Sequence, residues 1–145
     1  MDAALNRRAF AKSCLCLVPL ARAFSADKPE TLRGKLIIQS SSAPAADTTD
    51  RGRVLLDGDQ PTNKVLRDER VDGFEMEARG HFTAPGRFLI DPQHTRALLV
   101  RGQDGRLKMI TYWCEVCGIR AYTPGPCVCC QAETELELRD PDDIR

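Results

Sequence analysis

The sequence predicts a mainly β protein, in which a small β-barrel is followed by a C-terminal metal-binding β-hairpin. Three observations support this fold class. Short alternating or β-branched segments, separated by Gly, Pro and Asp, recur between residues 31 and 112. A single segment in that region follows a helix-initiation signal. Five of the seven cysteines then fall between residues 114 and 130, a density typical of a metal site or a disulfide framework.

The barrel region contains six predicted strands. Each is a short run of apolar, β-branched or alternating residues that ends at a turn signal such as Gly58-Asp59 or Asp91-Pro92. The segment 40–52, between the first two strands, is small, polar and contains proline, so we expect a flexible loop there. The predicted strands are 31–39, 53–57, 74–82, 87–90, 97–101 and 107–112.

A short helix is predicted between the second and third strands. Thr62 is a candidate N-cap for a helical segment over residues 63–70. Val65 and Leu66 would lie on its inner face, and Asp72-Gly73 would end it.

Two features of the later strands give sharper expectations. The alternation in 74–82 changes phase around Gly80, which predicts a bulge or a barrel corner at that glycine. The turn at 102–105, Gly-Gln-Asp-Gly, is a strong hairpin signal between the last two strands. We expect Leu99 and Ile110 to face inward across that hairpin.

The number of strands and the single helix resemble an oligonucleotide/oligosaccharide-binding (OB) barrel. The residues that support this resemblance are Leu-x-Gly-x-Leu at 32–36, Leu-Leu-Asp-Gly-Asp at 55–59, and the strand from Gly73 to Gly80. The resemblance implies an OB-like barrel over residues 31–111, with the C-terminal hairpin growing directly from its last strand.

Four of the C-terminal cysteines form two Cys-x2-Cys pairs: Cys114 with Cys117, and Cys127 with Cys130. Two thiolates three positions apart on a tight turn can face one ion, and a second such turn completes a tetrahedron. Gly118 follows the first pair, where the backbone often needs a positive φ. A strand at 119–122, a Pro-Gly turn and an alternating strand at 133–138 would form the hairpin.

This stretch resembles the zinc-ribbon and rubredoxin-like family. The matching residues are the aromatics Tyr112 and Trp113, the two cysteine pairs with Gly118, and the prolines at 124 and 126. The chain departs from the family at Gln131, where a small residue is usual, and at Cys129, an extra thiol inside the second pair. The block over residues 112–139 also resembles the tail of an uncharacterised family of exported bacterial proteins.

Several interpretations of the cysteines remain open. Four thiolates suit structural zinc, and iron uses the same ligand set. Disulfides or a redox-active Cys-x2-Cys are the alternative in an oxidising compartment. We expect Cys129 to be a bystander that points away from the ion, although it could replace Cys127 or Cys130 as a ligand.

The first 26 residues are typical of an export signal. Arg7-Arg8-Ala9-Phe10 followed by Lys12 resembles the twin-arginine motif, and the apolar run 14–21 is too short to span a bilayer as a helix. Cleavage after Ala23 or Ala26 would leave a mature, periplasmic or extracytoplasmic chain with no transmembrane segment. An ordinary amphipathic N-terminal helix is the alternative.

Charge and motifs narrow the class of function. The 21 basic residues balance the 21 acidic ones, so we expect no nucleic acid among the partners. No hydrolase motif or phosphate loop is present, and His81 and His94 are not paired with a nucleophile in sequence. Residues 140–145 read as a solvated acidic tail.

The sequence therefore favours a non-enzymatic, exported binding or assembly module, held by structural zinc, with an unknown protein partner. A rubredoxin-like iron electron carrier is the second interpretation, in which Tyr112, Trp113 and Tyr122 would shield the iron. A thiol–disulfide or metal-handling protein that uses Cys129 is the third.

Overall fold

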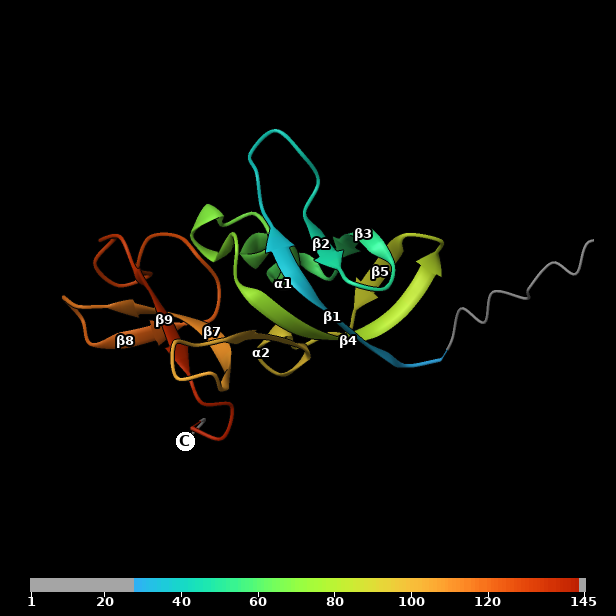
Figure 1. Cartoon of the computed structure of the whole chain (residues 1–145). Helices are drawn as coiled ribbons and strands as arrows, with labels where there is room; N and C mark the ends of the chain where they lie inside the picture. Colours follow the sequence, from blue (N-terminus) through green and yellow to red (C-terminus); the bar gives the residue numbers. More distant parts are fainter. Residues whose placement is uncertain (1–27, 144–145) are drawn as a thin grey trace, which may run out of the picture.

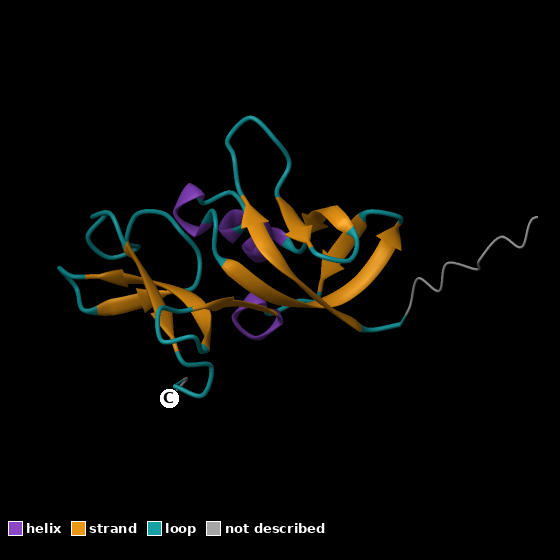
Figure 2. Cartoon of the chain, in the orientation of Figure 1, coloured by secondary structure: helices purple, strands orange, loops and turns teal. Residues whose placement is uncertain are grey.

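A computed structural model of the chain describes residues 28–143, and the predicted export signal lies outside them. Most of the described elements are strands, joined by short turns and three short helical segments (Figures 1 and 2). The helical segments are α1 (Gln60–Val65), the 3-10 turn η1 (Glu69–Val71) and α2 (His94–Ala97). The strands are β1 (Glu30–Ile37), β2 (Ala45–Thr48), β3 (Gly52–Asp57), β4 (Glu75–Ala84), β5 (Arg87–Ile90), β6 (Leu98–Arg101), β7 (Leu107–Cys114), β8 (Ile119–Ala121) and β9 (Glu135–Arg139).

Strands β1 to β5 close into a barrel, which confirms the predicted OB-like architecture. They are hydrogen-bonded in the order β1-β2-β3-β5-β4, and β4 returns to pair with β1. The β3–β5 pair is parallel and the other pairs are antiparallel. Helix α1 lies between β3 and β4 in the chain, and its Val65 is fully buried in the core.

Strand β4 places every second side chain in the core, in agreement with its alternating sequence. The predicted change of phase at Gly80 is wrong, because Met76, Ala78, Gly80 and Phe82 are all buried. The register shift lies farther along, between Phe82 and Ala84. Gly80 is needed for another reason: a Cβ there would overlap the Leu89 carbonyl oxygen on β5.

The predicted loop 40–52 contains a strand, β2, and the expectation of an entirely irregular segment was wrong. Its sequence, Ala-Ala-Asp-Thr, has no β-branched apolar residue and therefore gives no strand signal of its own. Pairing decides its conformation, because β2 is hydrogen-bonded to β1 on one side and to β3 on the other. The small side chains of Ala45 and Ala46 are buried.

The helix begins earlier than predicted. Asp59, not Thr62, is the N-cap, and its carboxylate accepts a hydrogen bond of 3.0 Å from the Thr62 backbone nitrogen. Helix α1 ends at Val65, and η1 forms a separate turn that overlaps the end of the predicted 63–70 segment. Val65 and Leu66 are fully buried, as expected.

The β6–β7 hairpin forms as predicted, but its inward face is shifted by one residue on β6. Leu98 and Val100 are fully buried in the core, whereas Leu99 is half-buried opposite Met109. Ile110 on β7 is fully buried, as expected. The run Ala-Leu-Leu-Val contains apolar residues on both faces of the strand, so the sequence alternation did not fix its phase.

Beyond β6, which pairs with β4 of the barrel, β7 is the central strand of a three-stranded extension of the same sheet (Figure 1). Its residues Tyr112 to Cys114 pair with β8, and Met109 to Trp113 pair with β9. The predicted metal-binding hairpin is therefore a sheet with β7 in the middle, and Cys114 is the last residue of that strand.

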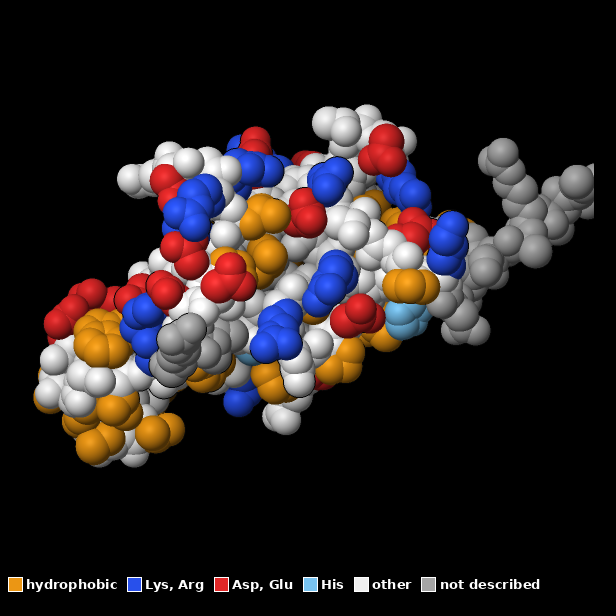
Figure 3. All heavy atoms as spheres, turned by 90° about the horizontal axis from the view of Figure 1, so that it is seen from below, with side chains coloured by type: hydrophobic (Ala, Val, Ile, Leu, Met, Phe, Trp, Pro, Cys, Tyr) orange, Lys and Arg blue, Asp and Glu red, His pale blue; other side chains and the backbone are white. Residues whose placement is uncertain are grey.

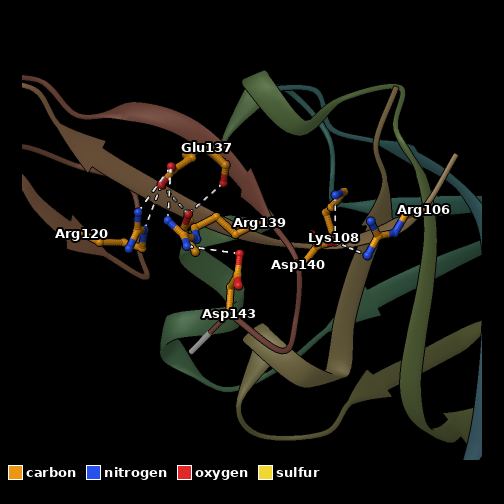
Figure 4. Close-up of polar contacts among 8 residues, drawn as sticks. Arg106, Lys108, Arg120, Glu137, Arg139, Asp140 and Asp143 are labelled. Carbon is orange, nitrogen blue, oxygen red and sulfur yellow. Dashed lines mark hydrogen bonds and ion pairs between the residues drawn. The ribbon is translucent and has the colours of Figure 1, made fainter. Parts of the chain in front are cut away.

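The C-terminal acidic residues are not a freely solvated tail. Asp140 accepts a hydrogen bond of 2.8 Å from Lys108 on β7, and Asp143 pairs with Arg139 at 3.3 Å (Figure 4). The Lys108–Asp140 contact links the end of β9 to β7, whereas the Arg139–Asp143 pair lies within the end of the chain segment itself. Over residues 28–143, the structure has no helix with the length and apolar character needed to cross a membrane.

The register of β6 gives a direct test of the core. Leu98→Ala should lower the free energy of unfolding by about 2–4 kcal/mol, because it removes apolar contacts and leaves a cavity. Leu99→Ala is the matched control and should cost roughly 1 kcal/mol or less, since Leu99 is half-buried. Denaturant unfolding of both variants measures the difference. A larger loss for Leu99→Ala would contradict this register.

Candidate metal centre

The first cysteine pair lies on a tight turn that continues β7. The Gly118 backbone nitrogen donates to the Cys114 carbonyl oxygen at 2.8 Å, and the Cys117 nitrogen approaches the Cys114 sulfur at 3.5 Å. Gly118 has a φ of 61°, which confirms the expected positive φ at this position. The turn therefore directs the Cys114 and Cys117 side chains to the same side.

The second pair repeats this geometry at the other end of the site. The Gln131 nitrogen donates to the Cys127 carbonyl oxygen at 2.9 Å, and the Cys129 nitrogen approaches the Cys127 sulfur at 3.4 Å. Gln131, four residues after Cys127, has a φ of 63°. It takes the place that Gly118 has in the first turn, in a conformation that disfavours a residue with a Cβ.

These two turns bring four sulfur atoms together. The Sγ atoms of Cys114, Cys117, Cys127 and Cys130 all lie within 4.8 Å of one another. The Cys114 and Cys130 sulfurs are 3.5 Å apart, well beyond the roughly 2.0 Å of a disulfide bond. All five cysteines among the described residues have free thiols, and Cys114 and Cys127 are buried.

The spacing fits a single tetrahedral ion. With metal–sulfur bonds of about 2.3 Å, the sulfurs of a tetrahedral thiolate site lie roughly 3.8 Å apart. The observed sulfur–sulfur distances, which range from 3.5 Å to at most 4.8 Å, lie on either side of that value. Binding of an ion would therefore require only a small shift of either cysteine turn. The donor set, four thiols, suits zinc or iron and not a hard cation such as Mg²⁺. The four cysteines are thus positioned to hold a metal ion.

The thiols are not equivalent as acids. The backbone N–H groups of Cys130 and Cys129 lower the pKa of the Cys127 thiol to about 7, because they stabilise its thiolate. Hydrogen bonding with neighbouring thiols, above all that of Cys129, raises the pKa of Cys117. Of these two thiols, Cys127 therefore ionises first. The thiol of Cys117 keeps its proton until a metal ion displaces it.

Cys129 lies outside the four-sulfur cluster and is exposed. Its thiol is nevertheless a neighbour of Cys117, on whose ionisation it acts. The extra thiol is thus placed beside the site, where it does not complete the tetrahedron.

Two side chains from the barrel hold the loops of the site. The Arg70 guanidinium donates to the Thr134 carbonyl oxygen at 2.8 Å and lies over the Tyr112 ring at 5.2 Å. The His94 Nε2–H group donates to the Tyr122 carbonyl oxygen at 2.6 Å. Thr134 and Tyr122 flank the second turn on either side along the chain, so both ends of that segment are fixed to the barrel.

A further set of contacts stabilises the three-stranded sheet itself. Arg120 on β8 makes two contacts with Glu137 on β9, at 2.9 and 3.3 Å (Figure 4), and its guanidinium lies over the Trp113 ring at 5.1 Å. Glu137 also accepts a hydrogen bond of 3.3 Å from the Thr111 hydroxyl. The two outer strands are therefore linked across the central strand.

The aromatic residues are divided between the barrel and the site. Tyr112 belongs to the barrel core, where burial and then the nearby Asp68 charge raise the pKa of its hydroxyl. Trp113 lies beside the first turn, since a Cβ at Gly118 would be 3.9 Å from its ring. Tyr122 is 43% exposed.

Arg70, His94 and Gln131 were not predicted as parts of this centre. The positive φ at Gln131 could have been predicted, because Gln131 follows Cys127 by four residues, as Gly118 follows Cys114. Arg70 lies 64 residues from its partner and His94 lies 28 from its own, and no local pattern marks such contacts. His81 is half-buried on β4 and takes no part in the four-sulfur cluster.

The two positive-φ positions should respond differently to substitution. Gly118→Ala should destabilise the centre by about 1 kcal/mol, since the added Cβ must adopt the left-handed conformation. Gln131→Gly should be neutral or stabilising, because it relieves the same strain while adding unfolded-state freedom. Fluorescence of Trp113, the only tryptophan, reports unfolding of this region. Equal losses in both variants would show that the Gln131 side chain has another role.

Protonation of His94 should destabilise the folded chain, because the charged ring is buried. Burial lowers the pKa of His94 and outweighs the opposing effects of the Tyr122 carbonyl and Asp59. The folded chain therefore binds fewer protons than the unfolded chain, whose histidines have a pKa of about 6.5, and stability falls as the pH drops below that value.

The control for this prediction is His94→Gln, which keeps an N–H donor but cannot be protonated. The difference in unfolding free energy between the natural chain and this variant should shrink between about pH 7 and 5. Thiolate protonation affects both proteins alike, so it cancels in the comparison. A difference that does not change with pH would contradict the assignment.

Comparison of the chain with protein-family models, with curated proteins and with solved structures finds no match. The arrangement of the four thiols on an OB-like barrel is therefore the basis for any functional conclusion.

Proposed function

We propose that this chain is an exported, non-enzymatic binding or assembly module whose C-terminal sheet is held by one structural zinc ion. The observation that supports this most is the convergence of Cys114, Cys117, Cys127 and Cys130 from two equivalent turns. Zinc has no redox chemistry and suits a site that is closed by four protein ligands.

The small size of the sheet supports a structural role for the ion. Strand β9 has no fully buried residue, and Leu136 and Leu138 are only partly buried against the barrel core. A sheet with so little core of its own needs another source of stability, which a tetrahedral ion supplies on folding.

The surface around the thiols supports a role in binding. The large hydrophobic side chains with high exposure among the described residues are Val116, Ile119, Tyr122 and Val128, all in the metal-centre region. Val116 and Val128 are 74% and 86% exposed, and each lies on one of the two cysteine turns. Figure 3 shows hydrophobic side chains gathered at this end of the molecule. Exposed apolar groups so close together favour contact with a protein partner.

A rubredoxin-like iron electron carrier is the second candidate. Backbone N–H groups approach the sulfurs of Cys114 and Cys127, and such hydrogen bonds tune the potential of iron–thiolate centres. The two candidates share the ligand set and differ in the bound ion and in its role. Purified protein with one zinc and no visible absorption favours the module, whereas iron with thiolate charge-transfer bands favours the carrier.

Substitution of single cysteines tests the ligand set. Replacing Cys114, Cys117, Cys127 or Cys130 with Ser should reduce bound metal well below one equivalent, because an alcohol does not replace a thiolate. Cys129→Ser is the matched control and should keep full metal content. Elemental analysis of protein expressed without residues 1–26 measures both. Full metal in any of the first four variants, or its loss in Cys129→Ser, would contradict the proposed site.

We also propose that residues 1–26 direct the folded chain through the twin-arginine route. This route transports folded proteins, so a metal site could be filled before the thiols meet an oxidising compartment. Substitution of Arg7 and Arg8 by Lys should leave the precursor in the cytoplasm, as measured by cell fractionation. Unchanged amounts of mature protein in the exported fraction would refute this route.

A further inference from the structure

A cavity of about 390 Å³ opens in the wall of the barrel, away from every residue of the metal centre. It lies along the parallel pair β3–β5, where Leu55, Leu56 and Asp57 face Arg87, Phe88 and Leu89 in register. One side is apolar and includes Pro44, Leu55 and Leu89. Its volume is in the range of small-molecule sites.

The polar side of the cavity contains two arginines with no carboxylate partner. Arg67, just after α1, and Arg87, at the start of β5, both line the cavity. Neither makes an ion pair with any carboxylate of residues 28–143, whereas Arg33, Arg53 and Arg101 each pair with an acidic residue on a neighbouring strand. Two guanidinium groups therefore flank this space with their charge unmatched by direct contact.

The nearest acidic group, Asp57, is held in place by other donors. Its Oδ1 atom accepts hydrogen bonds from the Asn63 amide at 2.9 Å and from the Gly58 backbone nitrogen at 2.8 Å. These bonds lower the pKa of Asp57, with smaller contributions from Arg87 and Arg67, so the carboxyl group is ionised. One fixed negative charge faces two positive charges, which leaves one positive charge for a ligand.

We propose that this cavity binds a small monocarboxylate with a short apolar body. The carboxylate would lie between Arg67 and Arg87, whose planar groups can each donate two parallel hydrogen bonds to it. The apolar body would lie against Pro44, Leu55 and Leu89, which line the adjacent wall. A single negative charge matches the single unmatched positive charge, and the apolar wall disfavours a fully hydrated anion such as phosphate.

The test uses hexanoate as the probe and hexan-1-ol as its uncharged counterpart. Both are titrated into the zinc-loaded chain lacking residues 1–26, and the backbone amide signals of Leu55 and Leu89 are followed by NMR. Hexanoate should give saturable shifts at these residues, and hexanol should bind at least about tenfold more weakly, because charge-assisted hydrogen bonds are lost. Inorganic phosphate should also bind more weakly, since it has no apolar body.

Three variants assign the effect to the two arginines. Arg67→Gln and Arg87→Gln should each weaken hexanoate binding by about tenfold. Both side chains are exposed, so the variants should fold, which the dispersion of the amide signals verifies. Arg106→Gln is the control, because Arg106 is exposed and pairs with Asp140 outside the cavity, and it should bind as the natural chain does.

Each other outcome overturns the proposal. Absence of saturable shifts, equal affinity for hexanol or phosphate, or unchanged affinity in both cavity variants would show that the cavity does not recognise a carboxylate. The cavity contains no thiol, so the zinc content of the same samples reports separately on the metal centre.

Discussion

The structure depends on the backbone pairing of β7, the strand that connects the barrel side of the sheet to the three strands of the metal centre. Its first residues pair with β6 beside the barrel, and its last residues pair with β8 next to the thiols. Strand β9 pairs with the other edge of β7 from Met109 to Trp113, so it lies opposite both β6 and β8. Because a strand with both edges paired cannot shift its register without breaking two ladders, the position of Cys114 is set by the barrel.

The second cysteine turn has no such strand beneath it and relies on other contacts. Residues 122–134 form an irregular segment that is fixed at its two ends, by His94 at the Tyr122 carbonyl and by Arg70 at the Thr134 carbonyl. Its β-pairing is limited to an isolated bridge between Pro126 and Glu133, beside backbone hydrogen bonds within the second cysteine turn. An ion shared with Cys114 and Cys117 would join this segment to β7, which explains how a turn with little core can be ordered.

Much of this arrangement could be predicted from the sequence, and the errors have physical causes. Cysteine spacing predicted the two turns because a tight turn and a tetrahedral ion leave few alternatives. Strand β2 was missed since Ala45 and Ala46 become strand residues only through their neighbours. The inward face of β6 was misjudged because Leu98, Leu99 and Val100 are all apolar. The contacts of Arg70 and His94 join residues far apart in the chain, so only the closed fold brings them together.

The central claim is that the bound ion orders β8, β9 and the second cysteine turn, whereas the barrel fixes only the position of β7. Amide hydrogen exchange with and without metal tests this claim most directly. In zinc-loaded protein, amides of β8, β9 and residues 127–134 should be protected along with those of the barrel. After chelation, protection should be lost there while β1, β4 and Ile110 keep theirs, because the barrel core does not involve the thiols. Unchanged protection of β8 and β9 after the metal is removed, or loss of protection throughout the barrel, would contradict the account.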